Sequence, residues 1–476
     1  MASEAHPWAK TGGLAEVVGA LPPALARLGH RVTLVLPKYR GIEAAGAPLV
    51  TILALGPSTT QIGYFEEAVS PNVTLVLVDV PALFEREALY GTADADYGDN
   101  AWRFAVFSRA ALEYPRLRGV RPSIIHAHDW QTGLVPAYQK MHFSPDPHVG
   151  GVPAVFTIHN LAFQGLFPAS TVPSIGLGWE VMNVQAMEYW GGISYLKAGI
   201  NFSERITTVS PTYAREIVRP ELGFGMDGVL ARRSGDLVGI LNGIDVERWN
   251  PSADPFVPAA FSVEDLAGKA DARKALLEAV GLPDVGLPLV GLVSRLTDQK
   301  GFDLIAAAAD DLMALRAAWV MLGSGERRYE DLWRSLVTRH AGRVSATIGF
   351  DERLAHLIEA GADLFLMPSR FEPCGLNQMY SLRYGTVPVV RATGGLADTV
   401  QDYDPQTGSG TGFTFTDYSP GAMVQAMRRA LTVFGDRQAW ARIQKAGMAR
   451  DHSWDASAAE YVKVYRTLTE PLGRPA

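Results

Sequence analysis

The chain has 476 residues, a length that predicts roughly two to four domains because a single hydrophobic core rarely extends over so many residues. Hydrophobic residues make up 47% of the chain and charged residues 20%, which excludes a disordered or fibrous protein. Lys and Arg number 43 against 50 Asp and Glu, so no excess positive charge is available for a nucleic acid, and a single cysteine, Cys374, excludes an internal disulfide.

In the first half, apolar runs rich in Val, Ile and Phe alternate with segments of helical period. This alternation predicts parallel strands joined by helices. We expect helices at 100–114 and 181–198. The expected strands are 32–36, 49–55, 73–80, 123–128, 154–159 and 206–209.

The second half repeats this pattern, with expected helices at 302–315 and 327–339 and a last helix at 456–468. The expected strands are 287–294, 318–322, 343–348, 362–367, 387–391 and 412–415. The sequence therefore predicts an α/β protein with two Rossmann-like, doubly wound parallel-sheet domains that face each other across a cleft. Ligands of such sheets bind beyond the carboxyl ends of the strands.

The segment 245–262 contains three prolines and no sustained period, which is typical of a domain connection. We place the N-terminal domain at 1–236, the C-terminal domain at 237–452 and the last helix within 453–476. The first residues lack the basic and apolar parts of a signal peptide, and no run approaches the ~18 apolar residues of a membrane span. We expect a soluble cytoplasmic protein without a membrane partner.

The string Lys10-Thr11-Gly12-Gly13-Leu14 precedes a segment of helical period. Glycines at a helix N-terminus let backbone N–H groups approach a phosphate, and a lysine adds a full positive charge. A phosphate site is one interpretation. A Gly-containing turn with a solvated lysine is the other.

Two cations, Arg295 and Lys300, follow the strand at 287–294 and precede Gly301 and a helix. Arginine can bind two phosphate oxygens at once while lysine acts as a point charge, so the pair suits a diphosphate. Basic residues that are merely exposed on the surface are the alternative.

Glu372 follows the strand at 362–367 and precedes another helix. A carboxylate there can accept sugar hydroxyls or stabilise a developing oxocarbenium charge, or it can simply cap the helix. Cys374 is better explained as a small buried residue than as a nucleophile, because no histidine or asparagine partner is evident beside it.

His126 and His128 share one face of a strand end, with Asp129 opposite, but a third metal ligand at a recognisable spacing is missing. Asp94 and Asp96 resemble the acidic pair that binds a divalent metal in one class of sugar-nucleotide transferases, yet their Gly- and Asp-rich loop is typical of a solvated turn. We expect no metal.

His159 and Asn160 end the strand at 154–159 and offer a donor and an acceptor at the sheet edge. A core histidine bonded to the backbone is the alternative.

Together these strings resemble the bacterial glycogen synthase and plant starch synthase family over nearly the whole chain. The matching motifs, in order, are KTGGL, YGDN with RF, HAHDWQTG, TIHNLAFQG, NGID with WNP, VSRLTDQKG, PSRFEPCGLNQ and TGGLADTV. The resemblance implies a metal-independent, cofactor-free transferase. It would move glucose from ADP-glucose to the non-reducing 4-OH of an α-1,4-glucan, such as glycogen or a maltooligosaccharide, with retention.

Catalytic residues follow from the same resemblance. It places Lys10 near the distal phosphate, and Arg295 and Lys300 on the diphosphate. His159 would meet the sugar near its 6-hydroxyl and reacting carbon, and Glu372 would hold sugar hydroxyls.

The resemblance also implies a set of substrate-binding residues and a last helix that crosses back to the first domain. The set comprises Gly12, Gly13, Asp129, Asn160, Asn242, Cys374, Gly375, Leu376, Gly394 and Gly395.

Three features depart from the family. Glu16 stands where Asp is more frequent, and Asn377 where Thr is frequent. The family also has an apolar strand directly before its Ser-Glu and KTGGL strings, whereas this sequence has only Met1-Ala2 before Ser3-Glu4. We expect that strand to be central in the first sheet.

Two other functions remain open from the residues. One is a sugar-nucleotide epimerase or a phosphorylase of the same architecture. The other is a catalytically idle protein that binds glucan or nucleotide.

Overall fold

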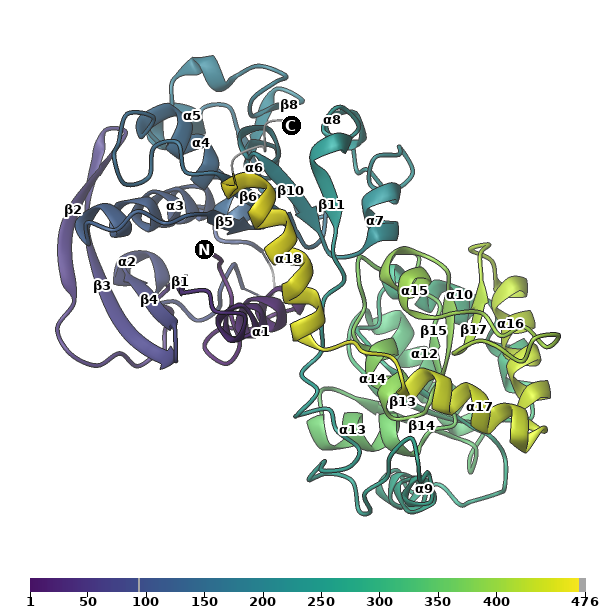
Figure 1. Ribbon diagram of the computed structural model, residues 1–476. Coiled ribbons are helices and arrows are strands. Elements are labelled where there is room, and N and C mark those ends of the chain that lie inside the picture. The colour runs from purple at the N-terminus through teal and green to yellow at the C-terminus, as the bar shows by residue number, and fades with distance from the viewer. Residues whose placement is uncertain (93–94, 471–476) are drawn as a thin grey trace, which may run out of the picture. The chain divides into compact units, whose positions relative to one another are not determined.

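In the computed structural model, which describes residues 1–92 and 95–470, the chain divides into two units (Figure 1). Unit 1 comprises Met1–Val209, Ala214–Gly243 and the chain from Trp454 on, and unit 2 comprises Ser210–Tyr213 and Ile244–Ser453. The change of unit falls at Gly243, not at the residue 237 that the sequence suggested. The reason is β11 (Leu237–Gly239), which pairs with a strand of unit 1.

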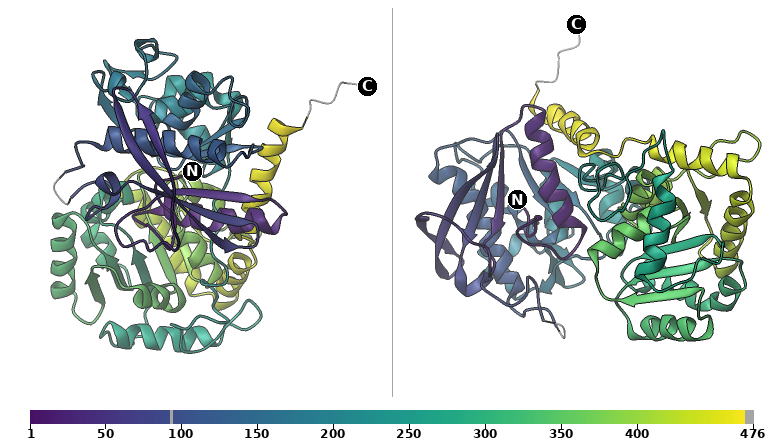
Figure 2. Two further views of the ribbon diagram at one scale, coloured as in Figure 1. Left: turned by 90° about the vertical axis from the view of Figure 1, so that its left-hand side faces the viewer. Right: turned by 90° about the horizontal axis from the view of Figure 1, so that it is seen from below.

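One sheet of unit 1 has the strand order β1-β4-β3-β2. β1 (Val32–Pro37) is parallel to β4 (Val73–Asp79), but β3 (Ser58–Ser70) is antiparallel to both β4 and β2 (Leu49–Leu55). The sequence analysis missed β3 and expected parallel strands throughout. Short connections favour antiparallel pairing here, because a parallel pair needs a long crossover. Figure 2 shows β2 and β3 as a long ribbon in the purple part of the chain.

The second sheet of unit 1 is wholly parallel, with the order β11-β10-β6-β5. Its other strands are β5 (Ile125–His128), β6 (Ala154–Ile158) and β10 (Arg205–Thr208). All three lie within a residue or two of the predicted strands.

The first residues of the chain lie between these two sheets. The Ala2 N–H donates to the Val35 carbonyl of β1 at 3.2 Å. The Met1 ammonium group donates to the His126 carbonyl of β5 at 2.9 Å, and the His128 N–H donates to the Met1 carbonyl at 3.2 Å. Met1 and Ala2 thus bridge β1 and β5 at the place where the sequence analysis expected a central strand.

Most helices of unit 1 follow strands in the usual alternating order. The last one, α18 (Trp454–Thr469), packs along α1 (Gly13–Arg27) in a shared core that includes Val17, Leu21 and Tyr461 (Figure 1). The other helices are α2 (Pro81–Phe84), α3 (Asn100–Leu117), α4 (Leu134–His142), α5 (Thr171–Ser174), α6 (Tyr195–Phe202), α8 (Asp227–Arg232) and α7 (Pro211–Glu216), whose first residues belong to unit 2.

The expected helix at 181–198 is wrong. This region contains a hairpin of β8 (Glu188–Tyr189) and β9 (Gly192–Ser194), which extends to β7 (Leu166–Pro168), and α6 begins only at Tyr195. The two consecutive glycines 191 and 192 favour a tight turn and interrupt the helix.

Unit 2 contains one parallel sheet of six strands in the order β14-β13-β12-β15-β16-β17. Its strands are β12 (Leu289–Val293), β13 (Ala318–Gly323), β14 (Val344–Ile348), β15 (Leu364–Met367), β16 (Val387–Arg391) and β17 (Phe413–Phe415), and each matches a predicted strand. The order runs outward in both directions from β12 and β15, which is the Rossmann arrangement. Buried apolar side chains cover both faces of the sheet.

Helices connect these strands. The expected helix at 302–315 is divided at Ala308 into α10 (Phe302–Ala307) and α11 (Ala309–Met313). The remaining helices are α9 (Gly268–Ala279), α12 (Arg327–Arg339), α13 (Glu352–Gly361), α14 (Asn377–Arg383), α15 (Gly394–Thr399), α16 (Pro420–Phe434) and α17 (Arg437–Met448). Within the described chain, no helix has the length and apolar character needed to cross a membrane.

Candidate functional site

In unit 2, the predicted site residues meet at the point where the strand order reverses. Lys300 follows β12 and Glu372 follows β15, the two adjacent strands at this switch point. The Lys300 ammonium group lies 2.5 Å from Glu372 Oε2, and the Ser369 hydroxyl donates to the same oxygen at 3.0 Å. Glu372 is only 5% exposed. The structure thus brings together a cation and a carboxylate that the sequence predicted separately.

Close backbone packing holds the two loops in place. Gly301 has a φ of +79°, and a Cβ there would lie 2.0 Å from the Pro368 carbonyl oxygen, so no other residue fits. The Arg370 N–H donates to the Gln299 carbonyl at 2.9 Å. Asn377 joins the start of α14 to the end of β12 by donating to the Val293 carbonyl at 2.6 Å. Lys300 and Glu372 therefore belong to one rigid loop pair.

Arg295 lies in the same loop as Lys300, and its side chain is exposed. Among the described residues it forms no ion pair, so its guanidinium group is available to an anion. The 2.9 Å bond from the Leu296 N–H to the Ser324 carbonyl fixes the adjacent backbone.

The other predicted residues of unit 2 form a backbone layer beneath Glu372. Cys374 is buried, which agrees with a packing role. The Gly395 N–H donates to the Glu372 carbonyl at 3.1 Å, and a Cβ at Gly394 would lie 1.8 Å from that carbonyl oxygen. The start of α15 therefore packs on the Glu372 loop. Gly375 and Leu376 lie between this layer and α14, and direct contact of these residues with substrate stays a prediction.

In unit 1, a buried carboxylate that the sequence analysis did not single out holds the KTGGL turn. Glu4 accepts hydrogen bonds from the Thr11 N–H at 2.5 Å, the Thr11 hydroxyl at 2.7 Å and the Gly12 N–H at 3.3 Å. Tyr90 donates to the same carboxylate at 2.5 Å. In the sequence, the sign of this role is an acidic residue a few positions before a glycine-rich turn. Such a pattern is a weak signal on its own.

The turn is open on its other side. A Cβ at Gly12 or Gly13 would meet no atom within 4 Å, so there is space beside the N-terminus of α1. Lys10 is paired with Glu16, and its side chain is 43% exposed. The turn thus offers a cation and a helix N-terminus to an anion, as the phosphate interpretation requires.

Three histidines lie together at the ends of β5 and β6. The rings of His126 and His128 stack with centroids 4.1 Å apart, which confirms that they share a face. His128 Nδ1 lies 3.0 Å from His159 Nε2. Burial lowers the pKa of His159 to about 3 and holds that of His128 well below its usual value, so both rings are neutral near pH 7.

Asp129 adopts an unusual backbone conformation beside His159. Its φ of 57° and ψ of 179° lie in a region that residues other than glycine rarely adopt, and such strain is often found at functional sites. Its Oδ1 accepts the His159 N–H at 2.7 Å. Burial raises the pKa of Asp129 to about 7, although backbone donors oppose that effect.

Two asparagines complete the predicted set in unit 1. Asn160 Oδ1 accepts the Ala162 N–H at 3.1 Å and so stabilises the turn after β6. Asn242 is buried, and its Oδ1 has no hydrogen-bond partner among the described residues. An unsatisfied buried acceptor is costly, so it is a candidate contact for a ligand.

The sequence analysis also considered acidic and histidine residues as metal ligands. Over residues 1–92 and 95–470, no group of three or more His, Cys, Asp and Glu side chains is arranged to hold an ion. Asp94, one of the two aspartates weighed as metal ligands, lies outside the described residues. The other, Asp96, forms an isolated backbone bridge with Gly91.

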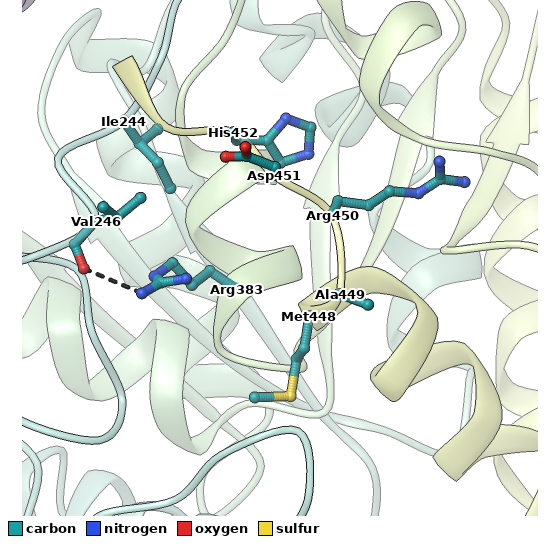
Figure 3. Close-up of a pocket in the computed structure, with 8 residues that line it drawn as sticks. All are labelled: Ile244, Val246, Arg383, Met448, Ala449, Arg450, Asp451 and His452. Carbon is teal, nitrogen blue, oxygen red and sulfur yellow. Dashed lines mark hydrogen bonds between the residues drawn. The ribbon is translucent and has the colours of Figure 1, made fainter. Parts of the chain in front are cut away.

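A separate cavity of about 260 Å³ lies in unit 2 (Figure 3). The close-up shows the Arg383 guanidinium directed to the Val246 carbonyl, which accepts its hydrogen bond at 3.1 Å, and the Arg450 side chain directed away from Arg383. None of the predicted site residues lines this cavity.

Comparisons with known proteins agree with this arrangement. Residues 1–232 match the family described as starch synthase catalytic domain, and residues 276–446 match glycosyl transferases group 1. A Rossmann sheet with Lys300 and Glu372 at its switch point, combined with these matches, defines a glycosyltransferase of the class built from two Rossmann-like domains. Glycogen synthase of Anaeromyxobacter dehalogenans strain 2CP-1 is 53% identical over 98% of each chain, and that of Koribacter versatilis is 48% identical over 98% of this chain and 96% of its own. The chain belongs to the bacterial glycogen synthase and plant starch synthase family, and it is an enzyme.

Solved structures lead to the same family. The catalytic domain of starch synthase IV from Arabidopsis thaliana, bound to ADP and acarbose, is 35% identical with a TM-score of 0.89, covering 99% of this chain and 98% of its own. Sucrose-phosphate synthase from Thermosynechococcus elongatus, at 18% identity and a TM-score of 0.62 over 98% of each chain, shares the fold.

Proposed function

We propose that the enzyme transfers glucose from ADP-glucose to the non-reducing 4-OH of an α-1,4-glucan with retention of configuration. The observation that carries this proposal is the Lys300–Glu372 pair at the Rossmann switch point, in a chain 53% identical to a glycogen synthase over 98% of its length. The ADP and acarbose bound by the starch synthase relative support a nucleotide-sugar donor and a glucan acceptor.

Cations of both units have a role in this reaction. Departure of the diphosphate leaves positive charge on the sugar and negative charge on the leaving group. Arg295, Lys300 and Lys10 stabilise the leaving group. Lys300 is paired with Glu372, so a diphosphate that binds Lys300 shares its charge and leaves Glu372 available to sugar hydroxyls.

His159 contributes as a neutral group. Because burial lowers its pKa to about 3, its imidazole can donate or accept a hydrogen bond without adding a charge beside the developing oxocarbenium ion. Asp129 and His128 fix the orientation of His159 through its backbone N–H and its ring nitrogen, respectively.

Retention is proposed to occur by attack on the face from which the phosphate leaves. The acceptor hydroxyl bonds to the anomeric carbon as the carbon–phosphate oxygen bond breaks, and the hydroxyl proton passes to the leaving phosphate. A covalent route requires a second carboxyl group about 5–5.5 Å from the first. Glu372 is the one carboxylate among the predicted site residues of unit 2, and it accepts hydrogen bonds from Lys300 and Ser369.

Nucleotide release tests the reaction. The protein is incubated with ADP-glucose or UDP-glucose, with and without glycogen, in the presence and absence of EDTA. We expect ADP release that requires glycogen and is insensitive to EDTA, and proton NMR should show new α-1,4 linkages.

Other outcomes identify the alternatives. Interconversion of the sugar nucleotide without glucan indicates an epimerase, and sugar release that needs inorganic phosphate indicates a phosphorylase. Glycogen binding without any turnover indicates an idle binding protein.

A further inference from the structure

The tip of the β8–β9 hairpin carries the most anomalous side chain of unit 1. Tyr189 pairs with Gly192, so Trp190 and Gly191 form a two-residue turn. Their φ values of 50° and 81° are those of a type I′ turn, which favours Asn, Asp or Gly at both positions. Trp190 instead places the largest apolar side chain there, and it is 86% exposed.

Trp190 therefore contributes little to folding. A bulky residue with positive φ is strained, and an indole ring that stays in water gains little from burial. A contiguous exposed apolar patch, unlike a single exposed residue, marks a binding surface.

A second aromatic residue with positive φ, Phe224, is linked through its backbone to Tyr189, the residue before Trp190. Phe224 has a φ of 49° and is 37% exposed. The Tyr189 hydroxyl donates to the Phe224 carbonyl at 3.0 Å, and a Cβ at Gly225 would lie 2.4 Å from that hydroxyl. The hairpin tip and the turn before α8 are thus fixed against each other. Tyr189, Trp190 and Phe224 form what we call the aromatic platform.

The platform is connected to the loop that follows His159 and Asn160. Gln164 in this loop donates to the Phe224 carbonyl at 2.8 Å, and its own carbonyl accepts the Ser194 hydroxyl of β9 at 2.9 Å. Phe163 in the same loop and Leu166 at the start of β7 are each more than half exposed. Apolar surface therefore accompanies the chain from the end of β6 to the platform.

We propose that the aromatic platform is an accessory binding site for the α-1,4-glucan acceptor. The flat faces of aromatic rings match the C–H faces of glucose units, while their edges and the Tyr189 hydroxyl remain compatible with sugar hydroxyls. The site rests on the proposed function, whose acceptor is a long glucan with many such faces, and Gln164 connects the platform to the loop that follows His159 and Asn160.

The test uses substitutions that separate a binding role from a structural one. Trp190→Asn and Phe224→Asn each remove the ring but introduce a residue that favours positive φ. We expect the melting temperature to stay constant or rise, and the Kd for glycogen, measured without donor by affinity electrophoresis, to increase about 2- to 10-fold for each variant. Trp190→Phe, which keeps a ring, should restore most of the affinity. Ile52→Ala, a change at an exposed apolar residue on β2 of the same unit, is the control and should leave the Kd unchanged.

Several results would overturn the proposal. A lower melting temperature for Trp190→Asn would show that the ring is structural, and an unchanged Kd in the double variant would remove the platform from glucan binding. If the Trp190→Asn variant sediments as a smaller particle than the unsubstituted protein in the absence of glucan, the platform is an interface between copies of the chain instead. Turnover with maltotriose is measured separately: its absence in the unsubstituted protein refutes the proposed function, whereas normal turnover with unchanged glycogen affinity in the variants refutes only the platform.

Discussion

Glu372 is a buried carboxylate whose negative charge is compensated by one cation, Lys300, and one hydroxyl, that of Ser369. We predict that Glu372→Ala lowers transfer by a factor of ~10²–10³, because the group that meets the sugar in the transition state is lost. The melting temperature should change little, since the loop backbone is held by Gly301, Asn377 and Gly395. Initial rates of ADP release and thermal unfolding measure the two effects.

Glu372→Gln serves as the matched variant. It keeps the size of the side chain and an acceptor for Ser369 but removes the charge opposite Lys300. A rate for either variant within a few-fold of the unsubstituted enzyme would exclude Glu372 from the site.

Asp129 gives a pH prediction. Its folded pKa of about 7 exceeds the ordinary value of 3.8, so between about pH 4 and 7 the folded state keeps a proton that the unfolded state has lost. Stability falls as pH rises through this window and levels off above it, by at most ~1.4 kcal/mol per pH unit. Asp129→Asn has no such proton, keeps an acceptor for the His159 N–H and tolerates positive φ.

The measurement is the difference in melting temperature between Asp129→Asn and the unsubstituted protein. The melting temperature of Asp129→Asn relative to that of the unsubstituted protein should rise from pH 4 to pH 8. The titration of the other buried groups affects both proteins equally and cancels in the difference. Parallel pH profiles would contradict the raised pKa.

At the residue scale, the sequence located the charged groups but not their partners. Lys300 and Glu372 were predictable because each follows a parallel strand, where ligands of Rossmann sheets bind. Their direct pairing depends on the side-by-side placement of β12 and β15, which are far apart in sequence. Glu4 was missed because a single acidic residue has no pattern, and its role appears only when Thr11, Gly12 and Tyr90 surround it.

At the scale of elements, the two helix-start glycines of the candidate site differ in a testable way. Gly12 has extended backbone and open space around it, whereas Gly301 combines positive φ with close contact to Pro368. Gly12→Ala should leave stability within ~0.5 kcal/mol and lower kcat/KM, because the new methyl group occupies the space proposed for phosphate. Gly301→Ala should destabilise the protein by about 1–3 kcal/mol.

Denaturant unfolding and steady-state kinetics on both variants provide the comparison. Full activity of Gly12→Ala would argue against a phosphate beside the KTGGL turn. Equal stability losses in the two variants would contradict the geometric difference.

Element prediction succeeded where a strand is a distinct apolar run and failed where it is not. All six strands of unit 2 were found, because each is a short apolar run between helices. β3 was missed because much of its length is exposed and carries Glu66 and Glu67. The hairpin at β8 and β9 was mistaken for a helix because its strands are too short to show a period of two.

At the scale of the whole molecule, the gap between β1 and β5 is bridged by three hydrogen bonds of Met1 and Ala2. We predict that about six apolar, β-branched residues before Ala2 raise both the melting temperature and the activity, because they supply backbone partners on both sides of the gap. Each buried unpaired backbone group costs ~1–3 kcal/mol against a typical total stability of ~5–15 kcal/mol.

A Gly/Ser extension of equal length is the control for this prediction, since it adds chain without filling an apolar gap. Thermal unfolding and ADP release are compared among the three proteins. If all three melt and turn over alike, the gap limits neither stability nor activity.

The assignment of Ser210–Tyr213 to unit 2 and of α18 to unit 1 has a practical consequence for proteolysis. Ser210 donates to the Pro373 carbonyl at 2.6 Å within unit 2, and Ser457 of α18 donates to the Leu241 carbonyl at 2.7 Å within unit 1. A protease that cuts once between residues 243 and 244 thus produces two fragments, each of which leaves a segment packed in the other's unit. Denaturing electrophoresis would show two bands, yet the nicked enzyme would still elute as one particle of 51.5 kDa.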